Sequence, residues 1–208
     1  VLNDARRQTV GLSHAFKDNF VFLAAAMPDR HALFADVTAT LTGHGFNILD
    51  ARTWVTNSGM VIYSFRTDSI YPSRLQEEKS WDRLRKDLLA ISTGSIDAEA
   101  MLERRRQARV GPTPANSVFD DPAVKVEQRT SDKHTIVDVH VKDEVGLLSR
   151  LCRAISDYGC EIGYACINTM GDVAVDVFYV HRAGKKLTNE EAESLRRHLI
   201  GALGLKIS

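Results

Sequence analysis

One pattern of strand-like and helix-like segments occurs twice in this chain. A nearly continuous apolar run at 20–27 and an alternating run at 135–141 are each followed by an acidic residue, a short loop and apolar residues at helical spacing. When Asp29 is set against Asp143, later landmarks coincide without a gap: Leu33 with Leu147, Val37 with Leu151, Gly45 with Gly159, Ile48 with Ile162 and Ala51 with Ala165. Repetition at a fixed spacing indicates two copies of one supersecondary unit.

The order of elements within each copy predicts the fold class. After the first helix come two strands joined by a tight turn and then a second amphipathic helix, so each copy is predicted to be β-α-β-β-α. A fourth strand is expected at 123–130 for the first copy and at 205–207 for the second. We therefore predict an α+β protein with two ferredoxin-like βαββαβ domains in tandem, whose antiparallel sheets carry helices on one face.

Shifts in composition along the chain predict its domain boundaries. Residues 1–19 are polar and without a clear period, which indicates a lead-in segment. The first domain is expected at 20–95 and the second at 131–208. Between them, 96–122 contain a short helix with a basic end and a linker rich in Gly and Pro. Because the chain starts with Val1, we expect it to be part of a longer protein.

Overall charge and hydropathy argue against several classes of partner. The 208 residues include 27 basic and 27 acidic side chains, so net charge gives no reason to expect a nucleic-acid partner. No apolar run approaches the roughly 20 residues of a membrane span, and no membrane partner is expected. The cysteines are odd in number and form no CxxC pair, so we expect buried thiols in a cytoplasmic protein: Cys152, Cys160 and Cys166.

Motifs for catalysis are missing from the sequence. It contains no nucleophile elbow, no GxGxxG after a strand and no GxxxxGK[ST], and its seven histidines have no metal-ligand spacing. Asp120-Asp121 stands before a proline, where a turn is the simpler interpretation. We therefore predict no catalytic residue, no metal site and no cofactor in this chain.

The best functional signal is the segment between strand and helix in the second copy. There Asp143 is followed three positions later by Gly146, at the expected N-terminus of a helix. Unpaired backbone N–H groups and the helix dipole attract a carboxylate at such a site, and glycine lets the ligand approach the backbone. Two simpler interpretations stay open, namely that Asp143 is a helix cap and that Gly146 serves close packing.

The residues of both copies resemble a known family. Each follows the pattern D-x-x-G-L-L, a helix, G-x-x-I and A-x-I-x-T, which resembles ACT domains, small amino-acid-sensing modules. Longer stretches resemble the C-terminal tandem ACT region of the bacterial PII uridylyltransferase family, the bifunctional uridylyltransferase/uridylyl-removing enzymes. These stretches are Asp176-Val177-Phe178-Tyr179-Val180, His134-Thr135-Ile136-Val137-Asp138-Val139, Asn47-Ile48-Leu49-Asp50-Ala51-Arg52 and Gly59-Met60.

This resemblance implies a regulatory function in nitrogen metabolism. Enzymes of the family transfer UMP from UTP to the signalling protein PII and remove it again, in nucleotidyltransferase and hydrolase domains that this chain lacks. Mg and UTP are therefore expected only in those upstream domains. The chain itself would sense an amino acid, glutamine by resemblance, and its other partners would be the upstream domains and PII.

The resemblance also implies where the ligand binds. ACT domains pair side by side, within or between chains, and hold the ligand between the loop of one domain and the second strand of its neighbour. The stronger site would then contain Asn47, Ile48, Asp143, Gly146, Leu147 and Leu148. A weaker second site is expected at Asp29, Ala32, Leu33, Glu161 and Ile162, because Ala32 replaces the family's glycine and ionised Glu161 offers only acceptors.

Two other functions stay open at this point. The chain could be a stand-alone tandem ACT regulator similar to those of the glycine-cleavage system, or an enzyme on a ferredoxin-like scaffold, since fold alone does not decide function.

Overall fold

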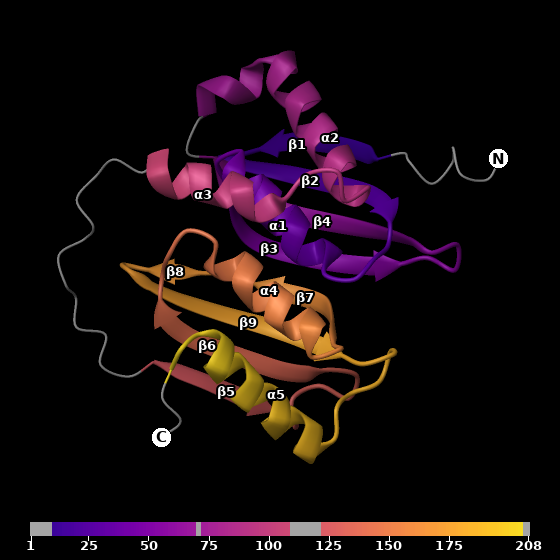
Figure 1. The fold of residues 1–208 in the computed structure, drawn as a ribbon, viewed down its shortest axis with the longest axis vertical. Coiled ribbons are helices and arrows are strands. Elements are labelled where there is room, and N and C mark those ends of the chain that lie inside the picture. The colour runs from indigo at the N-terminus through magenta and orange to yellow at the C-terminus, as the bar shows by residue number, and fades with distance from the viewer. Residues whose placement is uncertain (1–9, 70–71, 109–121, 206–208) are drawn as a thin grey trace. The chain divides into compact units, whose positions relative to one another are not determined.

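The computed structural model of the chain describes residues 10–69, 72–108 and 122–205. The chain divides into two compact units, Val1–Arg109 and Val110–Ser208. Each unit has its own antiparallel sheet and its own helices (Figure 1).

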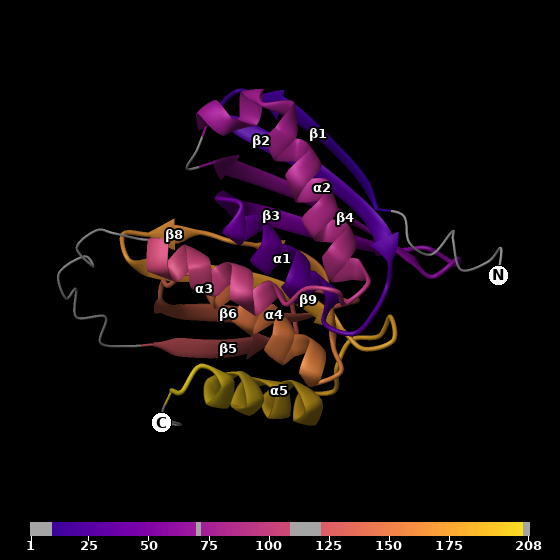
Figure 2. The ribbon, with the colours of Figure 1, turned by 45° about the horizontal axis from the view of Figure 1, so that its top comes forward.

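The first unit combines four strands with three α-helices and a short 3-10 helix. Its elements are β1 (Gly11–Lys17), β2 (Phe20–Pro28), α1 (Leu33–Gly43), β3 (Phe46–Val55), β4 (Met60–Ser69), η2 (Pro72–Gln76), α2 (Glu78–Ser92) and α3 (Ala98–Ala108). The strand order is β1-β2-β4-β3, with every neighbouring pair antiparallel. In Figure 2 the helices of this unit lie on one side of its sheet.

The edge strand of this sheet comes from a segment that we expected to be a lead-in. Residues 11–17 form β1, which pairs with β2 through a two-residue turn that places Lys17 opposite Phe20. Asp18 takes a positive φ of 54° in this turn, a conformation that Asp tolerates better than most residues. The prediction that 123–130 supply the fourth strand here was wrong, because β1 already occupies that edge and 123–127 pair in the second unit.

A ring contact holds β1 against the helical layer. His14 stacks on Trp81 of α2, with ring centroids 3.7 Å apart and an interplanar angle of 3°. Phe16 meets the same ring edge-on at 6.2 Å. Both side chains contact Trp81 of α2, so this strand packs on the helical layer, although His14 and Phe16 themselves stay exposed.

The core of the first unit lies between its sheet and α1. Alternate residues of β2 and β4 are buried against the helices, and the register sets Leu23 opposite Phe65. Leu33, Val37 and Leu41 of α1 are each at most 1% exposed. This alternation on strands and helical spacing on α1 produce the layered core that the sequence predicts.

Helix α3 belongs to this unit and packs on α1, so the prediction that it forms part of a linker at 96–122 needs revision. Leu102 is fully buried, and a Cβ added to Gly43 of α1 would lie 3.2 Å from Met101 Cβ. The reason is visible in α1, whose only charged residue is Asp36, so this helix has no face suited to water.

The second unit has the same plan with fewer helices. Its elements are β5 (Ala123–Glu127), β6 (Thr135–Lys142), α4 (Leu147–Asp157), β7 (Glu161–Cys166), β8 (Thr169–Met170), β9 (Val173–His181) and α5 (Asn189–Ala202). The main strands follow the order β5-β6-β9-β7, and the short β8 pairs with β9. Leu205 is not in a strand, and the rest of the expected strand 205–207 lies outside the described residues.

Packing in the second unit follows the amphipathic pattern of its sequence. Phe178 of β9 faces Val137 of β6, and both are fully buried beneath α4, whose Leu151 and Ile155 are also fully buried. Two of the three cysteines are buried as expected, but Cys166 is exposed.

Helix α5 starts with a complete capping box. The Thr188 hydroxyl accepts from the Glu191 N–H at 3.2 Å, and the Glu191 carboxylate accepts from the Thr188 N–H at 2.8 Å.

Both units are ferredoxin-like, so the predicted fold class is confirmed. Each has four main antiparallel strands with its helices on one face of the sheet, and β8 adds a short fifth strand to the second unit. They differ from the expected βαββαβ order because the edge strand precedes the repeat in sequence, as β1 or β5, instead of following it. No helix in the described part of the chain is long and apolar enough to cross a membrane.

Candidate functional site

The loop at 29–32, which joins β2 to α1, and the loop at 143–146, which joins β6 to α4, share one backbone conformation. In the first unit the N–H of Asp29 donates to the Gly59 carbonyl at 3.0 Å, and in the second the N–H of Asp143 donates to the Asp172 carbonyl at 2.8 Å. The first helical residue of each unit, Leu33 or Leu147, then closes a turn onto the carbonyl three positions back. The repeat seen in the sequence therefore extends to individual backbone hydrogen bonds.

Both helices start from a residue in the left-handed conformation. The N-cap of α4 is Gly146, with φ 90° and ψ 3°, and the N-cap of α1 is Ala32, with φ 55° and ψ 14°. A left-handed backbone costs roughly 1–2 kcal/mol for a residue with a Cβ and almost nothing for glycine. Only the second unit therefore has a left-handed N-cap without backbone strain, as we expected at a ligand loop.

Backbone donors at the start of α4 are partly used within the loop. The N–H of Leu147 donates to the Glu144 carbonyl at 3.1 Å, so it is not open to a ligand as we had expected. The N–H groups of Gly146 and Leu148 have no hydrogen-bond partner among the described residues. Gly146 and Leu147 are buried, Leu148 is half-buried and Asp143 is exposed.

Asp143 is not the N-cap of α4, because Gly146 holds that position. Its Oδ2 accepts a hydrogen bond of 3.4 Å from the hydroxyl of Thr169 in β8. The neighbouring carboxylate of Glu144 forms an ion pair of 2.7 Å with Arg150. Of these two acidic residues, Asp143 is thus the one whose carboxylate contacts the β8–β9 hairpin.

A second carboxyl group lies beneath the same hairpin. Asp176 of β9 is only 2% exposed, and its Oδ1 accepts from the backbone N–H of Asn168 at 3.4 Å. Burial raises the pKa of Asp176 to about 7, the Asn168 hydrogen bond opposes this shift, and the charge of Asp143 adds to it. The Asp143 charge is the smallest of these effects, so Asp176 keeps its proton mainly because it is buried.

The loop of the first unit is tied to its own helices. The Nη2 atom of Arg30 donates to Asp36 Oδ2 at 2.6 Å and to the Ile91 carbonyl at 2.7 Å. Arg30 also donates to the His31 carbonyl through Nη1 at 3.0 Å. This arginine bridges the loop to α1 and to the end of α2. Glu144, the equivalent residue of the second unit, makes no such bridge and pairs with Arg150 instead.

The strand residues expected at the two sites occupy equivalent positions. Asn47 of β3 and Glu161 of β7 are exposed, whereas the following Ile48 and Ile162 are buried. A break in strand register follows each isoleucine. Asn47 and Ile48 belong to the first unit and Asp143 to Leu148 belong to the second, so their combination in one site stays a prediction.

Sequence reasoning missed Asp176, Thr169 and Asn168 as parts of this region. A signal existed for Asp176, since it is the one acidic residue of the apolar segment 173–180 and shares its face with buried Phe178. Among the described residues, no group of three His, Cys, Asp or Glu side chains is placed to hold a metal ion.

Comparison with known proteins identifies the domain type. A family model described as "ACR9-like, ACT-like domain" matches residues 123–205. The second unit thus matches an ACT-like domain, and the first unit repeats its fold. A solved structure of aspartate kinase from Synechocystis is also similar, with a TM-score of 0.42 and 17% identity, over 89% of this chain and 27% of that one.

Curated proteins similar to this chain are bifunctional uridylyltransferase/uridylyl-removing enzymes. The protein from Phenylobacterium zucineum is 32% identical over 189 residues, which are 89% of this chain and 20% of the relative. The protein from Azospirillum brasilense is 31% identical over 84% of this chain and 19% of its own length, and that from Rhodospirillum rubrum is 29% identical over 74% and 16%. The chain thus spans about a fifth of the length of these relatives.

Proposed function

We propose that the chain is the amino-acid-sensing region of a PII uridylyltransferase/uridylyl-removing enzyme and that its ligand is glutamine. The observation that carries this proposal is the start of α4, where left-handed Gly146 leaves two backbone N–H groups without a partner beside exposed Asp143. The similarity to uridylyltransferase/uridylyl-removing enzymes supports the choice of parent protein and, through it, the choice of glutamine.

The chemistry of the loop suits a free amino acid. The N–H groups of Gly146 and Leu148, together with the positive end of the α4 dipole, would receive the ligand carboxylate. Asp143 would accept from the ligand ammonium, since the Glu144 carboxylate is already paired with Arg150. A bound ammonium would also relieve the unfavourable interaction between Asp143 and Asp176. Asn47 and Ile48 of a neighbouring ACT-like domain, in the same chain or another, would complete the site.

We propose that the equivalent loop of the first unit binds weakly or not at all. Ala32 carries a methyl group where a ligand would approach the backbone, and Arg30 ties this loop to α1 and α2. Asp29, Leu33, Glu161 and Ile162 would therefore form at most a weak site.

In the parent enzyme, glutamine would shift the balance between the transfer of UMP to PII and its removal. A ligand can shift such an equilibrium only by the difference between its affinities for the two states, typically about 1–3 kcal/mol. The upstream catalytic domains would detect the shift as a change in the arrangement of the ACT-like domains.

The test is ligand-induced stabilisation of this chain. A ligand that binds only the folded protein raises its melting temperature, so a thermal-shift panel of the twenty amino acids should single out glutamine, and titration calorimetry should find one strong site. Gly146→Val should abolish this response because it adds a branched side chain at the N-cap. A loop variant that still titrates with wild-type affinity contradicts the assignment.

Gly184→Val is the matched control for backbone strain. Gly184 also has a positive φ of 72° and has open space around it, but it lies in the turn after β9, at the other end of that strand from the β8–β9 hairpin. This variant should lose stability and keep its glutamine response.

A further inference from the structure

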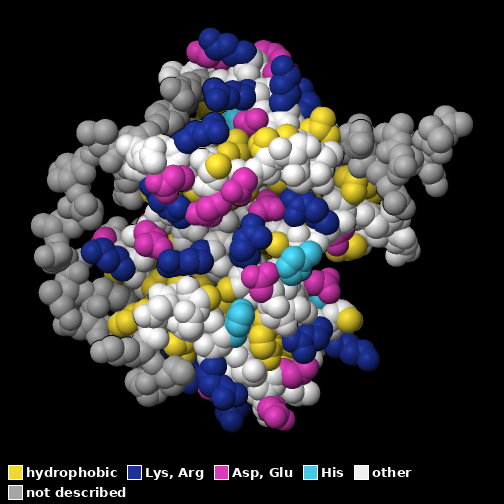
Figure 3. All heavy atoms as spheres, in the orientation of Figure 1, with side chains coloured by type: hydrophobic (Ala, Val, Ile, Leu, Met, Phe, Trp, Pro, Cys, Tyr) yellow, Lys and Arg dark blue, Asp and Glu magenta, His cyan; other side chains and the backbone are white. Residues whose placement is uncertain are grey.

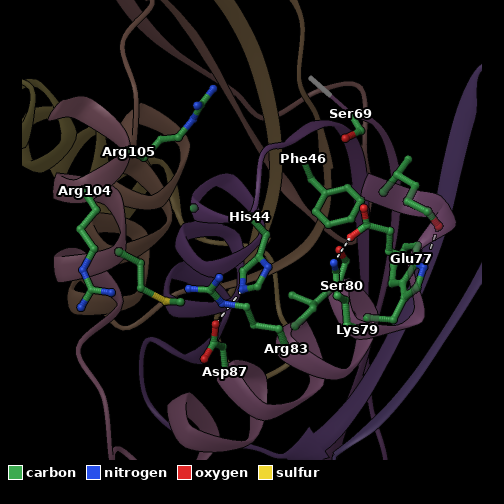
Figure 4. Close-up of a pocket in the computed structure, with 15 residues that line it drawn as sticks. His44, Phe46, Ser69, Glu77, Lys79, Ser80, Arg83, Asp87, Arg104 and Arg105 are labelled. Carbon is green, nitrogen blue, oxygen red and sulfur yellow. Dashed lines mark hydrogen bonds and ion pairs between the residues drawn. The ribbon is translucent and has the colours of Figure 1, made fainter. Parts of the chain in front are cut away.

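One hollow of the first unit is separate from both loops. It has a volume of about 930 Å³ and lies between the end of α1, the start of β3 and helices α2 and α3 (Figure 4). None of the residues expected to bind an amino acid lines it. Its size falls within the range of small-molecule sites, roughly 300–1,000 Å³.

The inner wall of this cavity is apolar and rigid. Phe46 and Trp81 are 6% and 3% exposed, and Leu84 is 1% exposed. The indole N–H of Trp81 donates to the Leu75 carbonyl at 3.0 Å, which holds the ring in place. A buried wall of this kind lowers the local dielectric and strengthens the field of charges at the rim.

The rim carries more positive than negative charge. Lys79, Arg83, Arg104 and Arg105 line the cavity together with only two carboxylates, Glu77 and Asp87, which leaves a surplus of two positive charges. Lys and Arg side chains are visible over α2 in the upper part of Figure 3.

Both carboxylates already have partners. Glu77 forms an ion pair of 3.1 Å with Lys79, and Asp87 lies 2.8 Å from His44 Nε2, the contact that is dashed in Figure 4. Arg83 and Arg104 have no ion pair or hydrogen bond among the described residues. Two guanidinium groups from two different helices are therefore available at one cavity.

His44 adds no charge to this rim at neutral pH. Burial lowers the pKa of its imidazole, and the opposing effect of Asp87 is smaller. At neutral pH the ring is thus neutral and donates to Asp87, and the charges of α2 that act on it are those of Asp87 and Arg83.

We propose that this cavity binds a small phosphate-bearing anion through Arg83 and Arg104. Guanidinium groups match phosphate oxygens with paired hydrogen bonds, and a surplus of two positive charges suits a dianion or a diphosphate. The first turn of α2 lines the cavity through Lys79 and Ser80, which adds the favourable end of a helix dipole. The apolar inner wall favours a compact ligand over an extended acidic peptide.

Inorganic pyrophosphate is the probe for this site, used with the whole chain at low ionic strength. We expect it to raise the melting temperature by several degrees and to bind with a dissociation constant that the double variant Arg83→Gln/Arg104→Gln weakens about tenfold or more. The matched control is Arg85→Gln/Arg106→Gln, which removes the same charge from the same two helices at residues that pair with Asp82 and Glu99 outside the cavity.

Each outcome is decisive. The site is supported if pyrophosphate binding is lost in Arg83→Gln/Arg104→Gln and kept in the control variant. Parallel titrations with phosphate and ADP then show whether the ligand is a free phosphate or a nucleotide. Equal weakening in both double variants would mean non-specific charge attraction and would overturn the proposal. Stabilisation by hexaglutamate but not by pyrophosphate would overturn it in favour of an acidic peptide.

Discussion

Ala32 and Gly146 hold the same left-handed N-cap position in two copies of one fold, with φ values of 55° and 90°. The copies make equivalent backbone hydrogen bonds around these residues, and the extra methyl group of Ala32 lies where the backbone would face a ligand. The two copies thus keep a common frame and differ in the chemistry of the loop.

Replacing Ala32 with glycine should stabilise the first unit. The substitution removes the strain of a left-handed alanine, roughly 1–2 kcal/mol. Glycine also makes the unfolded chain more flexible, which lowers stability by about 0.5–1 kcal/mol. We expect a net gain of about 0.5–1 kcal/mol in the free energy of unfolding, measured by urea denaturation. As a control, Ala35→Gly in the buried part of α1 should destabilise the unit.

The pH dependence of stability should carry the signature of Asp176. Its pKa is about 7 in the folded unit and 3.8 is its ordinary value, so between these pH values the folded unit retains a proton that the unfolded chain has lost. The free energy of unfolding of the second unit should fall by about 1.4 kcal/mol for each pH unit as the pH rises through this window, and it should level off above pH 7.

Asp176→Asn tests that assignment. The amide oxygen can still accept from the Asn168 N–H, but it never ionises, so melting curves between pH 4 and 7 should lose most of their slope. The exposed Asp132→Asn should leave the slope intact. An unchanged slope in the Asp176 variant would assign the pH dependence to other groups.

The docking of α3 on α1 should be essential for the first unit. Leu102 is fully buried, and its truncation to alanine should cost about 2–5 kcal/mol in the free energy of unfolding, measured by chemical denaturation. Gln107→Ala on the exposed side of α3 should cost little. If both variants unfold alike, α3 is a linker after all.

The stack of His14 on Trp81 should control the order of β1. His14→Ala removes a stacked ring pair worth about 0.5–1.5 kcal/mol, so backbone amides of 11–17 should exchange hydrogen faster. Ser13→Ala, on the opposite face of β1, should leave their exchange unchanged.

Local pattern was enough to predict the repeat, the helices and the fold class of this chain. Alternating apolar residues, helical spacing and turn glycines act over a few neighbouring positions, so they can be read without knowing distant contacts. The loop at 143–148 was found in the same way, because a strand, an acidic residue and a glycine before a helix are local features.

Tertiary packing decided what local pattern left open. The edge strand β1 and the docking of α3 depend on His14 meeting Trp81 and on Leu102 covering α1, contacts between residues far apart in sequence. The buried carboxyl of Asp176, its neighbour Asp143 and the charged cavity around Arg83 and Arg104 likewise arise only when separate elements come together. Burial and electrostatic environment belong to the folded assembly of side chains, because they depend on distances that the order of residues does not specify.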